Sequence, residues 1–188
     1  MTTATSSSGP ARLGSTDLIA SCVTLYSVAV TLPLFDLLGR NPEFFVAHRV
    51  GGADIVAIAL VVAIVIPLLL GGLVAVVDRI DHRAGRVVHA AVLGLLGGTI
   101  AVVILKASPL DGLPWWGYGA IAISAGSGVV YAYHRFANLR WVLRIGVVVP
   151  LVVVGLFLLG SRTSALVLPS EPPAASAVGF PADAPPIV

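Results

Sequence analysis

Few side chains in this 188-residue sequence could carry out acid–base or metal chemistry, and histidine is the most versatile of them. Hydrolytic and metal sites usually show fixed spacings such as HExxH, CxxC or GxSxG, because a helix or a tight turn brings the reacting groups together. None of these motifs is present, and no two histidines have a metal-binding spacing: His48, His82, His89 and His134. The sequence therefore predicts no catalytic residue, no cofactor-binding residue and no metal ligand.

His89 is the one histidine that lies inside an apolar stretch of the chain. Ionisable side chains in a membrane are costly, and they often mark a functional path. His89 lies near the end of its stretch, so a hydrogen bond to a neighbouring side chain is the simpler explanation. His82 and His134 fall among arginines between apolar stretches, where we expect them to be solvated.

Two acidic residues, Asp36 and Asp54, lie near the ends of apolar stretches rather than in their middle. Asp36 precedes Arg40 by four residues, which is a favourable pair on one face of a helix. We interpret this pair as an anchor at the membrane surface. A proton-coupled carrier would need acidic side chains near the midplane of several spans, and the sequence has none there.

Cys22 is the only cysteine, so no disulfide bond can form within the chain. It falls in the first apolar stretch, where a free cysteine behaves as a small hydrophobic side chain. We expect it to be buried and unreactive.

The chain has too little charge to cover a soluble domain. Only 11% of its residues are charged and 57% are hydrophobic, and the mean hydropathy is +1.01. An average soluble domain has about 25% charged residues. The net charge of +2 does not indicate nucleic-acid binding, because the basic residues occur in twos and threes between apolar stretches and form no continuous basic face. Lipid is therefore expected to be the solvent for much of the surface.

Five apolar stretches are candidates for membrane-spanning helices, because about 20 residues cross the hydrocarbon layer. Each is continuously apolar, without the alternation that lipid-facing strands require. The stretches are residues 18–38, 53–77, 87–105, 115–133 and 145–160. The sequence thus predicts an all-α protein, an integral membrane bundle of five transmembrane helices. Pro33, Pro67 and Pro150 should kink three of these helices.

Small residues recur at intervals of four in the third and fourth stretches. Such residues let helix backbones approach closely where lipid gives no hydrophobic drive for association. The two sets are Ala90, Gly94 and Gly98, and Ala120, Ser124 and Gly128. We predict that the third and fourth helices pack through these faces. A homo-oligomer interface is the alternative.

The distribution of lysine and arginine predicts the orientation, because cytoplasmic loops carry more of them. Seven lie on the side of the N-terminus, namely Arg12, Arg79, Arg83, Arg86, Arg135, Arg140 and Arg144. Four lie on the other side, namely Arg40, Arg49, Lys106 and Arg162. Aromatic residues cluster at both predicted boundaries, as expected for the headgroup regions. The chain is therefore predicted to be a multi-pass protein of the plasma (cytoplasmic) membrane, with its N-terminus inside and its C-terminus outside.

These predictions divide the chain into three segments. Residues 1–16 are predicted to be a disordered cytoplasmic tail, residues 17–160 the five-helix transmembrane domain, and residues 161–188 a Pro-rich extracytoplasmic linker. The linker ends on Ile187 and Val188, a β-branched pair typical of the start of a buried strand. Either a second domain follows these residues or they form a frayed tail.

A resemblance to a known family begins with Pro-Leu-Phe-Asp-Leu-Leu-Gly-Arg-Asn-Pro-Glu-Phe-Phe-Val-Ala at residues 33–47. This stretch resembles the N-terminal membrane region of large sulfatase-like proteins of high-GC bacteria, which are similar to members of the alkaline phosphatase superfamily. The resemblance continues through Arg-Ala-Gly-Arg-Val-Val-His at 83–89, the fifth apolar stretch and residues 166–188. The plan of five spans followed by an external hydrolase is similar to that of lipoteichoic acid synthases.

The resemblance implies a hydrolase domain after the linker, with Asp and His as ligands of a divalent metal and Thr, Ser or formylglycine as nucleophile. None of those motifs is present in residues 1–188, so no catalytic residue can be transferred onto this sequence. The expected function is a membrane anchor that positions an extracytoplasmic sulfatase-like hydrolase and is itself non-catalytic. Its expected partners are the lipid bilayer and that hydrolase, either as a C-terminal domain or as a separate protein. A small polytopic carrier or half-carrier subunit is the alternative.

Overall fold

The computed structural model describes residues 14–108 and 112–161, and about 90% of these residues are helical. No strand occurs in these two segments. The all-α prediction is therefore confirmed for this part of the chain. Most of the predicted N-terminal tail and all but the first residue of the predicted linker lie outside the described residues.

Four continuous helical segments are long and apolar enough to cross a membrane. They are Ser15–Arg40, Gly52–Ile80, His82–Lys106 and Ala137–Gly160. Each contains one of the predicted spans, so four of the five predicted stretches have the length and composition of membrane spans. These segments support the prediction of a membrane-embedded protein.

Three of the four segments contain more than one helix. The first contains α1 (Ser15–Tyr26) and α2 (Leu32–Arg40), and the second contains α4 (Gly52–Leu60) and α5 (Ile66–Ile80). The third is the single helix α6 (His82–Lys106), and the fourth contains α8 (Ala137–Ile145) and α9 (Val149–Gly160). The short helix α3 (Glu43–Ala47) lies between α2 and α4.

The remaining predicted span corresponds to α7 (Trp115–Arg135), which has 21 residues but is not apolar enough to be counted with the other four. Its glycine, serine, tryptophan and tyrosine residues lower its mean hydropathy. The number of five spans therefore stays a prediction.

Each of the three prolines named above follows a helical segment of non-α geometry. The segments are the π-helical Ser27–Thr31 (η1) before Pro33, the π-helical Val61–Val65 (η2) before Pro67 and the 3-10-helical Gly146–Val148 (η3) before Pro150. A proline has no N–H to donate, and its ring clashes with the carbonyl four residues earlier. A locally widened or tightened turn relieves this clash. The irregular turns therefore lie where the sequence places the prolines, and the predicted kinks stay a prediction.

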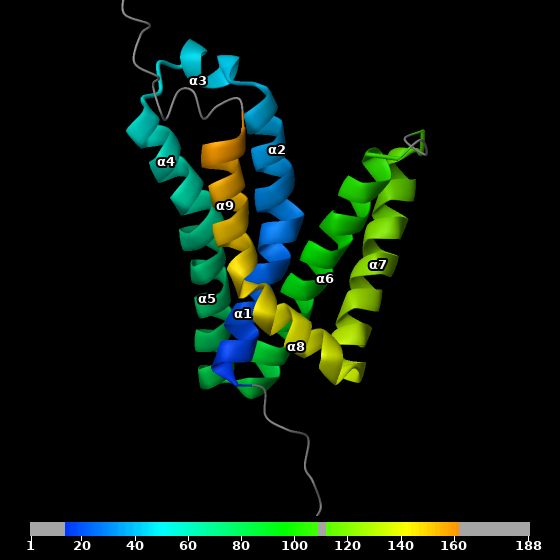
Figure 1. The fold of residues 1–188 in the computed structure, drawn as a ribbon. Coiled ribbons are helices and arrows are strands. Elements are labelled where there is room, and N and C mark those ends of the chain that lie inside the picture. The colour runs from blue at the N-terminus through cyan, green and yellow to red at the C-terminus, as the bar shows by residue number, and fades with distance from the viewer. Residues whose placement is uncertain (1–13, 109–111, 162–188) are drawn as a thin grey trace, which may run out of the picture.

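The first span forms the centre of the bundle. Within its most apolar part 61% of the residues are buried, compared with 28% in each of the other three. Figure 1 shows α4, α5 and α9 beside α1 and α2, whereas α6 and α7 lean away from α2 and α9 toward the end that carries α3. The α5–α6 and α7–α8 turns lie at the opposite end, near the start of α1 (Figure 1). The two arginine-rich loops, 78–86 and 134–141, are therefore on one side of the bundle.

Large apolar side chains cover much of the outer surface of the bundle. Leu69, Leu95 and Leu159 are 68%, 72% and 73% exposed. Ile123 on α7 is exposed to a similar extent. Apolar surface this extensive is unusual for a soluble monomer, and it agrees with a lipid environment.

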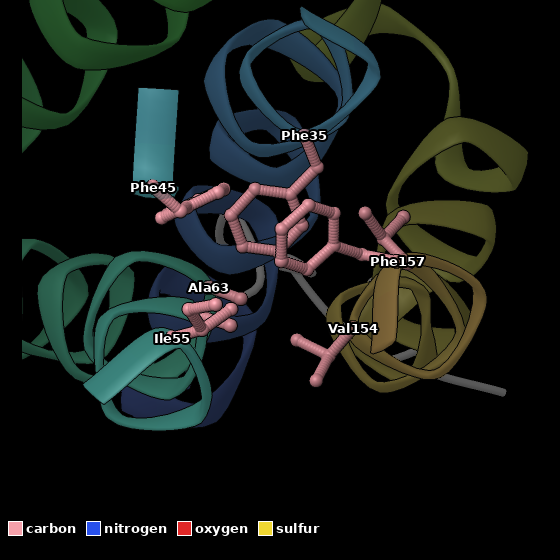
Figure 2. Close-up of a cluster of buried hydrophobic side chains, with 8 residues drawn as sticks. Phe35, Phe45, Ile55, Ala63, Val154 and Phe157 are labelled. Atoms are coloured by element: carbon pink, nitrogen blue, oxygen red, sulfur yellow. The ribbon is translucent and has the colours of Figure 1, made fainter. Parts of the chain in front are cut away.

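A cluster of buried side chains joins α2, α3, α4 and α9. Figure 2 shows Phe35 of α2 against Phe157 of α9, with Ile55, Val154 and Phe45 around them. The two phenylalanine rings are stacked, with centroids 4.6 Å apart and an angle of 29° between their planes. This cluster attaches the last span to the centre of the bundle.

The helices α6 and α7 pack closely against each other, as predicted, and glycine makes this possible. A Cβ atom at Gly98 of α6 would lie 2.6 Å from the carbonyl oxygen of Ala122. A Cβ atom at Gly126 of α7 would overlap the carbonyl oxygen of Gly94. The backbones therefore approach too closely at these positions for any side chain.

The predicted face of α7 is wrong, although the predicted face of α6 is correct. The contact uses Ala122 and Gly126, while Ala120, Ser124 and Gly128 are exposed. A Cβ atom at Gly128 would have no neighbour within 4 Å. Small residues fill nearly every position of this part of α7, so two different faces show the same spacing of four. Only the position of α6 decides between them.

Candidate functional site

The buried polar side chains lie mainly on one face of the central helix. Ser21 and Thr24 are on α1, and Ser27 and Thr31 are on η1, with spacings of three and four residues. Such spacings bring side chains onto one face of a helix. His89 on α6 is the fifth buried polar residue. His89 stood out in the sequence as a possible buried polar group, whereas the four hydroxyl groups did not, although their helical spacing was a signal for a common face.

His89 forms a hydrogen bond with Ser21, and 2.9 Å separate its Nε2 atom from the serine Oγ. Each residue is only 1% exposed. The serine Oγ also lies 2.9 Å from the carbonyl oxygen of Leu18 in its own helix, so it links His89 to the backbone of α1. The prediction that His89 pairs with a neighbouring side chain is confirmed, and the partner lies on another span.

The Ser21–His89 pair has the composition of a nucleophile and its base, but it lies in the packed interior of the bundle. A catalytic serine has to give its proton to the imidazole, and here the carbonyl oxygen of Leu18 lies 2.9 Å from the hydroxyl and competes for that proton. With both side chains buried, no substrate can reach them. The pair therefore acts as a cross-link between α1 and α6, and such a bond contributes about 1 kcal/mol to stability.

Tyr133 brings α7 into the same cluster. Its ring lies edge-on to the ring of His89, with centroids 5.1 Å apart, and the residue is 1% exposed. Ser21 lies close to the tyrosine hydroxyl, but no described residue forms a hydrogen bond of acceptable geometry with that hydroxyl. The cluster joins three helices near the arginine-rich end of the bundle.

The other hydroxyls of the central helix serve the backbone. Thr24 Oγ1 donates to the carbonyl oxygen of Leu143 at 2.7 Å, which attaches α8 to α1. Ser27 Oγ donates to the carbonyl oxygen of Val23 within its own helix at 2.8 Å. The Thr31 hydroxyl has no hydrogen-bond partner among the described residues.

The two acidic residues from the sequence analysis have local partners. Asp36 forms an ion pair with Arg40 at 2.8 Å, and both side chains are more than half exposed, so the predicted pairing is confirmed. The carboxylate of Asp54 accepts a bond from the backbone N–H of Gly51 at 3.3 Å, which caps the start of α4. Neither residue lies against a histidine.

The remaining histidines have separate local contacts. His48 contacts the carbonyl oxygen of Phe44 at 2.7 Å, His82 pairs with Asp78 at 3.3 Å, and His134 is exposed. Cys22 is completely buried, as predicted. Residues 14–108 and 112–161 contain no group of three His, Cys, Asp or Glu side chains that could hold a metal ion.

Comparison of the chain with protein-family models, with curated proteins and with solved structures gave no match in any of the three. The resemblance of residues 33–47 to sulfatase-like membrane proteins therefore stays a prediction. The polar groups in the interior of the bundle connect its helices to one another. The packing of the helices is therefore the feature that bears on function.

Proposed function

We propose that this chain is a five-span membrane domain that holds an extracytoplasmic sulfatase-like hydrolase domain at the plasma membrane and has no catalytic activity of its own. In this proposal the N-terminus is cytoplasmic, and α9 leads outward into the Pro-rich segment. The hydrolase is either a continuation of the chain or a separate partner. The resemblance of residues 33–47, 83–89 and 166–188 motivates the identity of the attached domain.

The main support for an anchor function is that the end of α9 is packed against α2 of the central span. Phe157 is 5% exposed and stacks on Phe35 of the central span. At the end of α9, a Cβ atom at Gly39 would lie 3.0 Å from the Cβ of Ser161, so α2 and the end of α9 are in direct contact. The Ser161 hydroxyl also donates to the carbonyl oxygen of Phe157 at 2.5 Å. An anchor needs a rigid point of exit for the domain that it holds, and these contacts supply one.

The length and packing of α7 support the fifth span. Its 21 residues give a helix about 32 Å long, which matches a hydrocarbon layer of about 30 Å. Its partner along this length is α6, a span by both length and composition. With α7 across the membrane, both arginine-rich loops fall on one side, in agreement with the positive-inside rule.

We expect single cysteines on the two sides of the bundle to react differently with an impermeant thiol reagent on whole cells. In a Cys22→Ala background, Val46→Cys in α3 should be labelled, because it is 61% exposed on the proposed outer side. Arg83→Cys, also exposed, should be protected until the cells are permeabilised. Labelling of Arg83→Cys on intact cells together with protection of Val46→Cys would reverse the proposed orientation.

We expect residues 1–188 in liposomes to hydrolyse neither aryl sulfates nor aryl phosphates above the rate of empty liposomes, with divalent metals present. The reason is that a metal-dependent hydrolase needs several convergent acidic and imidazole ligands, and the described residues bring no three together. The measurement is the release of the coloured phenol. Hydrolysis that depends on added metal would contradict the non-catalytic role.

A carrier is the second candidate, and one observation favours it. The π-helical segments η1 and η2 contact each other inside the bundle, and Thr31 in η1 has a buried hydroxyl without a partner among the described residues. Interrupted helices line the substrate sites of many transporters, and π-helical segments are frequent at functional sites. The same liposomes discriminate between the two functions. Uptake of protons or small solutes that Thr31→Val abolishes would favour the carrier over the anchor.

A further inference from the structure

A cleft with a volume of about 810 Å³ lies between α2, α6 and α9. Its walls are Leu32 and Phe35 on α2, Val103 on α6, and Leu156 and Phe157 on α9. It occupies the region where α6 leans away from α2 and α9 in Figure 1. Leu32 and Leu156 line the cleft and are 48% and 66% exposed. The described residues therefore leave apolar surface inside the cleft uncovered.

The charged groups of the cleft are confined to one end. Asp36 and Arg40 lie in the last two turns of α2, level with Gly160 and Ser161 at the end of α9. Arg40 uses Nε and one terminal nitrogen in its bonds to Asp36. A guanidinium has five N–H donors and a carboxylate accepts about four bonds, so each group keeps capacity for a further polar partner. The cleft is thus amphipathic along its length.

We propose that this cleft binds one phospholipid whose headgroup carries both a phosphate and a primary ammonium. The acyl chains lie against the apolar walls, and the headgroup lies at the end of α2. The phosphate accepts hydrogen bonds from Arg40, which suits bidentate contact with phosphate oxygens. The ammonium donates to Asp36. The proposal needs only that this end of the bundle lies in a bilayer, so it holds for an anchor and for a carrier alike.

Charge complementarity selects this occupant over other lipids. Arg40 and Asp36 are adjacent and opposite in charge. A headgroup with both charges can place its phosphate on Arg40 and its ammonium on Asp36. An anionic lipid without the ammonium would pair with Arg40 but would bring its negative charge close to Asp36.

Two glycines of α9 provide a matched test of the cleft. Gly160 lines the cleft and Gly155 does not, and a Cβ atom at either would have no neighbour within 4 Å. Gly160→Leu therefore fills the cleft without a backbone clash, whereas Gly155→Leu adds the same side chain to the same helix elsewhere. The protein is purified in mild detergent, washed, and incubated with phosphatidylethanolamine, and bound lipid is counted by native mass spectrometry. We expect one lipid per chain for the wild type and for Gly155→Leu, and about a tenfold weaker affinity for Gly160→Leu.

The headgroup contacts are tested by competition between phosphatidylethanolamine and phosphatidylglycerol. The wild type should prefer phosphatidylethanolamine. Asp36→Asn should remove that preference, because the carboxylate that receives the ammonium is lost. Arg40→Gln should weaken the binding of both lipids by about tenfold. Equal affinity of the wild type for the two lipids, or an unchanged preference in Asp36→Asn, would overturn the proposed headgroup chemistry.

A photoreactive acyl chain separates the bound lipid from lipid at the general surface. With a diazirine-bearing phosphatidylethanolamine, crosslinks after washing should lie at Val103 and Leu156. They should be absent from Leu69 and Leu159, which are at least as exposed but lie outside the cleft. Crosslinks spread over all four residues, or a count of bound lipid unchanged in folded Gly160→Leu, would overturn the site. Retained elution volume in size-exclusion chromatography identifies the folded variant.

Discussion

Replacing Gly126 with leucine is expected to separate α7 from α6 and to lower the stability of the bundle substantially. A Cβ atom at Gly126 would overlap the carbonyl oxygen of Gly94, which is backbone and cannot rotate away. Overpacking of a tight contact typically costs about 1–3 kcal/mol, and here the whole helix has to move. Because α7 has α6 as its main neighbour, no other interface can compensate. Thermal unfolding of the detergent-purified protein measures the effect.

Gly128 provides the control for this prediction, since it lies on the same helix two residues away and a Cβ atom there would have open space. Gly128→Leu should leave the unfolding temperature nearly unchanged. The alanine variants sharpen the comparison. Gly128→Ala should raise stability slightly, because alanine favours a helix over glycine by about 1 kcal/mol, whereas Gly126→Ala should lower it. Equal losses at the two positions would mean that α7 does not use the Ala122–Gly126 face.

The sequence could predict that α7 packs closely against α6 but not which of its two small-residue faces makes the contact. Small residues predict a close helix–helix contact, and continuous apolar stretches predict spans, because both depend on the chemical nature of residues along one helix. The choice between Gly126 and Gly128 depends on the direction from which α6 approaches. That direction is set by the other spans, through contacts between residues far apart in the chain.

The polar contacts show the same difference between contacts along one helix, which the sequence predicts, and contacts between distant helices, which it does not. The Asp36–Arg40 ion pair could be predicted because its partners are four residues apart on one helix. The Ser21–His89 bond joins residues 68 positions apart, and nothing local connects them. The sequence could indicate that His89 needed a partner, because an unpaired polar group is costly in a membrane. It could not name Ser21, since four hydroxyl residues with suitable spacing lie on the central span.

Replacing Phe157 with alanine is expected to release the end of α9 from the bundle. Phe157 is 5% exposed, and its ring stacks on Phe35 at 4.6 Å. A buried phenylalanine truncated to alanine costs about 3–5 kcal/mol in soluble cores. We expect a loss near the lower end of that range, about 3 kcal/mol, because surrounding lipid reduces the hydrophobic part of the cost and leaves the loss of packing. Chemical or thermal unfolding in detergent measures this difference.

Leu159→Ala is the control for Phe157→Ala, because it also removes a large apolar side chain from α9, at a position that is 73% exposed. Its effect on the free energy of unfolding should be small. A cysteine in place of Ser161, in the Cys22→Ala background, reports on the end of α9 directly, since Ser161 contacts α2 at Gly39. Phe157→Ala should raise the rate at which this thiol reacts, and Leu159→Ala should not. A similar reaction rate in both variants would mean that Phe157 does not hold the end of α9 to the bundle, and the proposed anchor function would lose the observation that carries it.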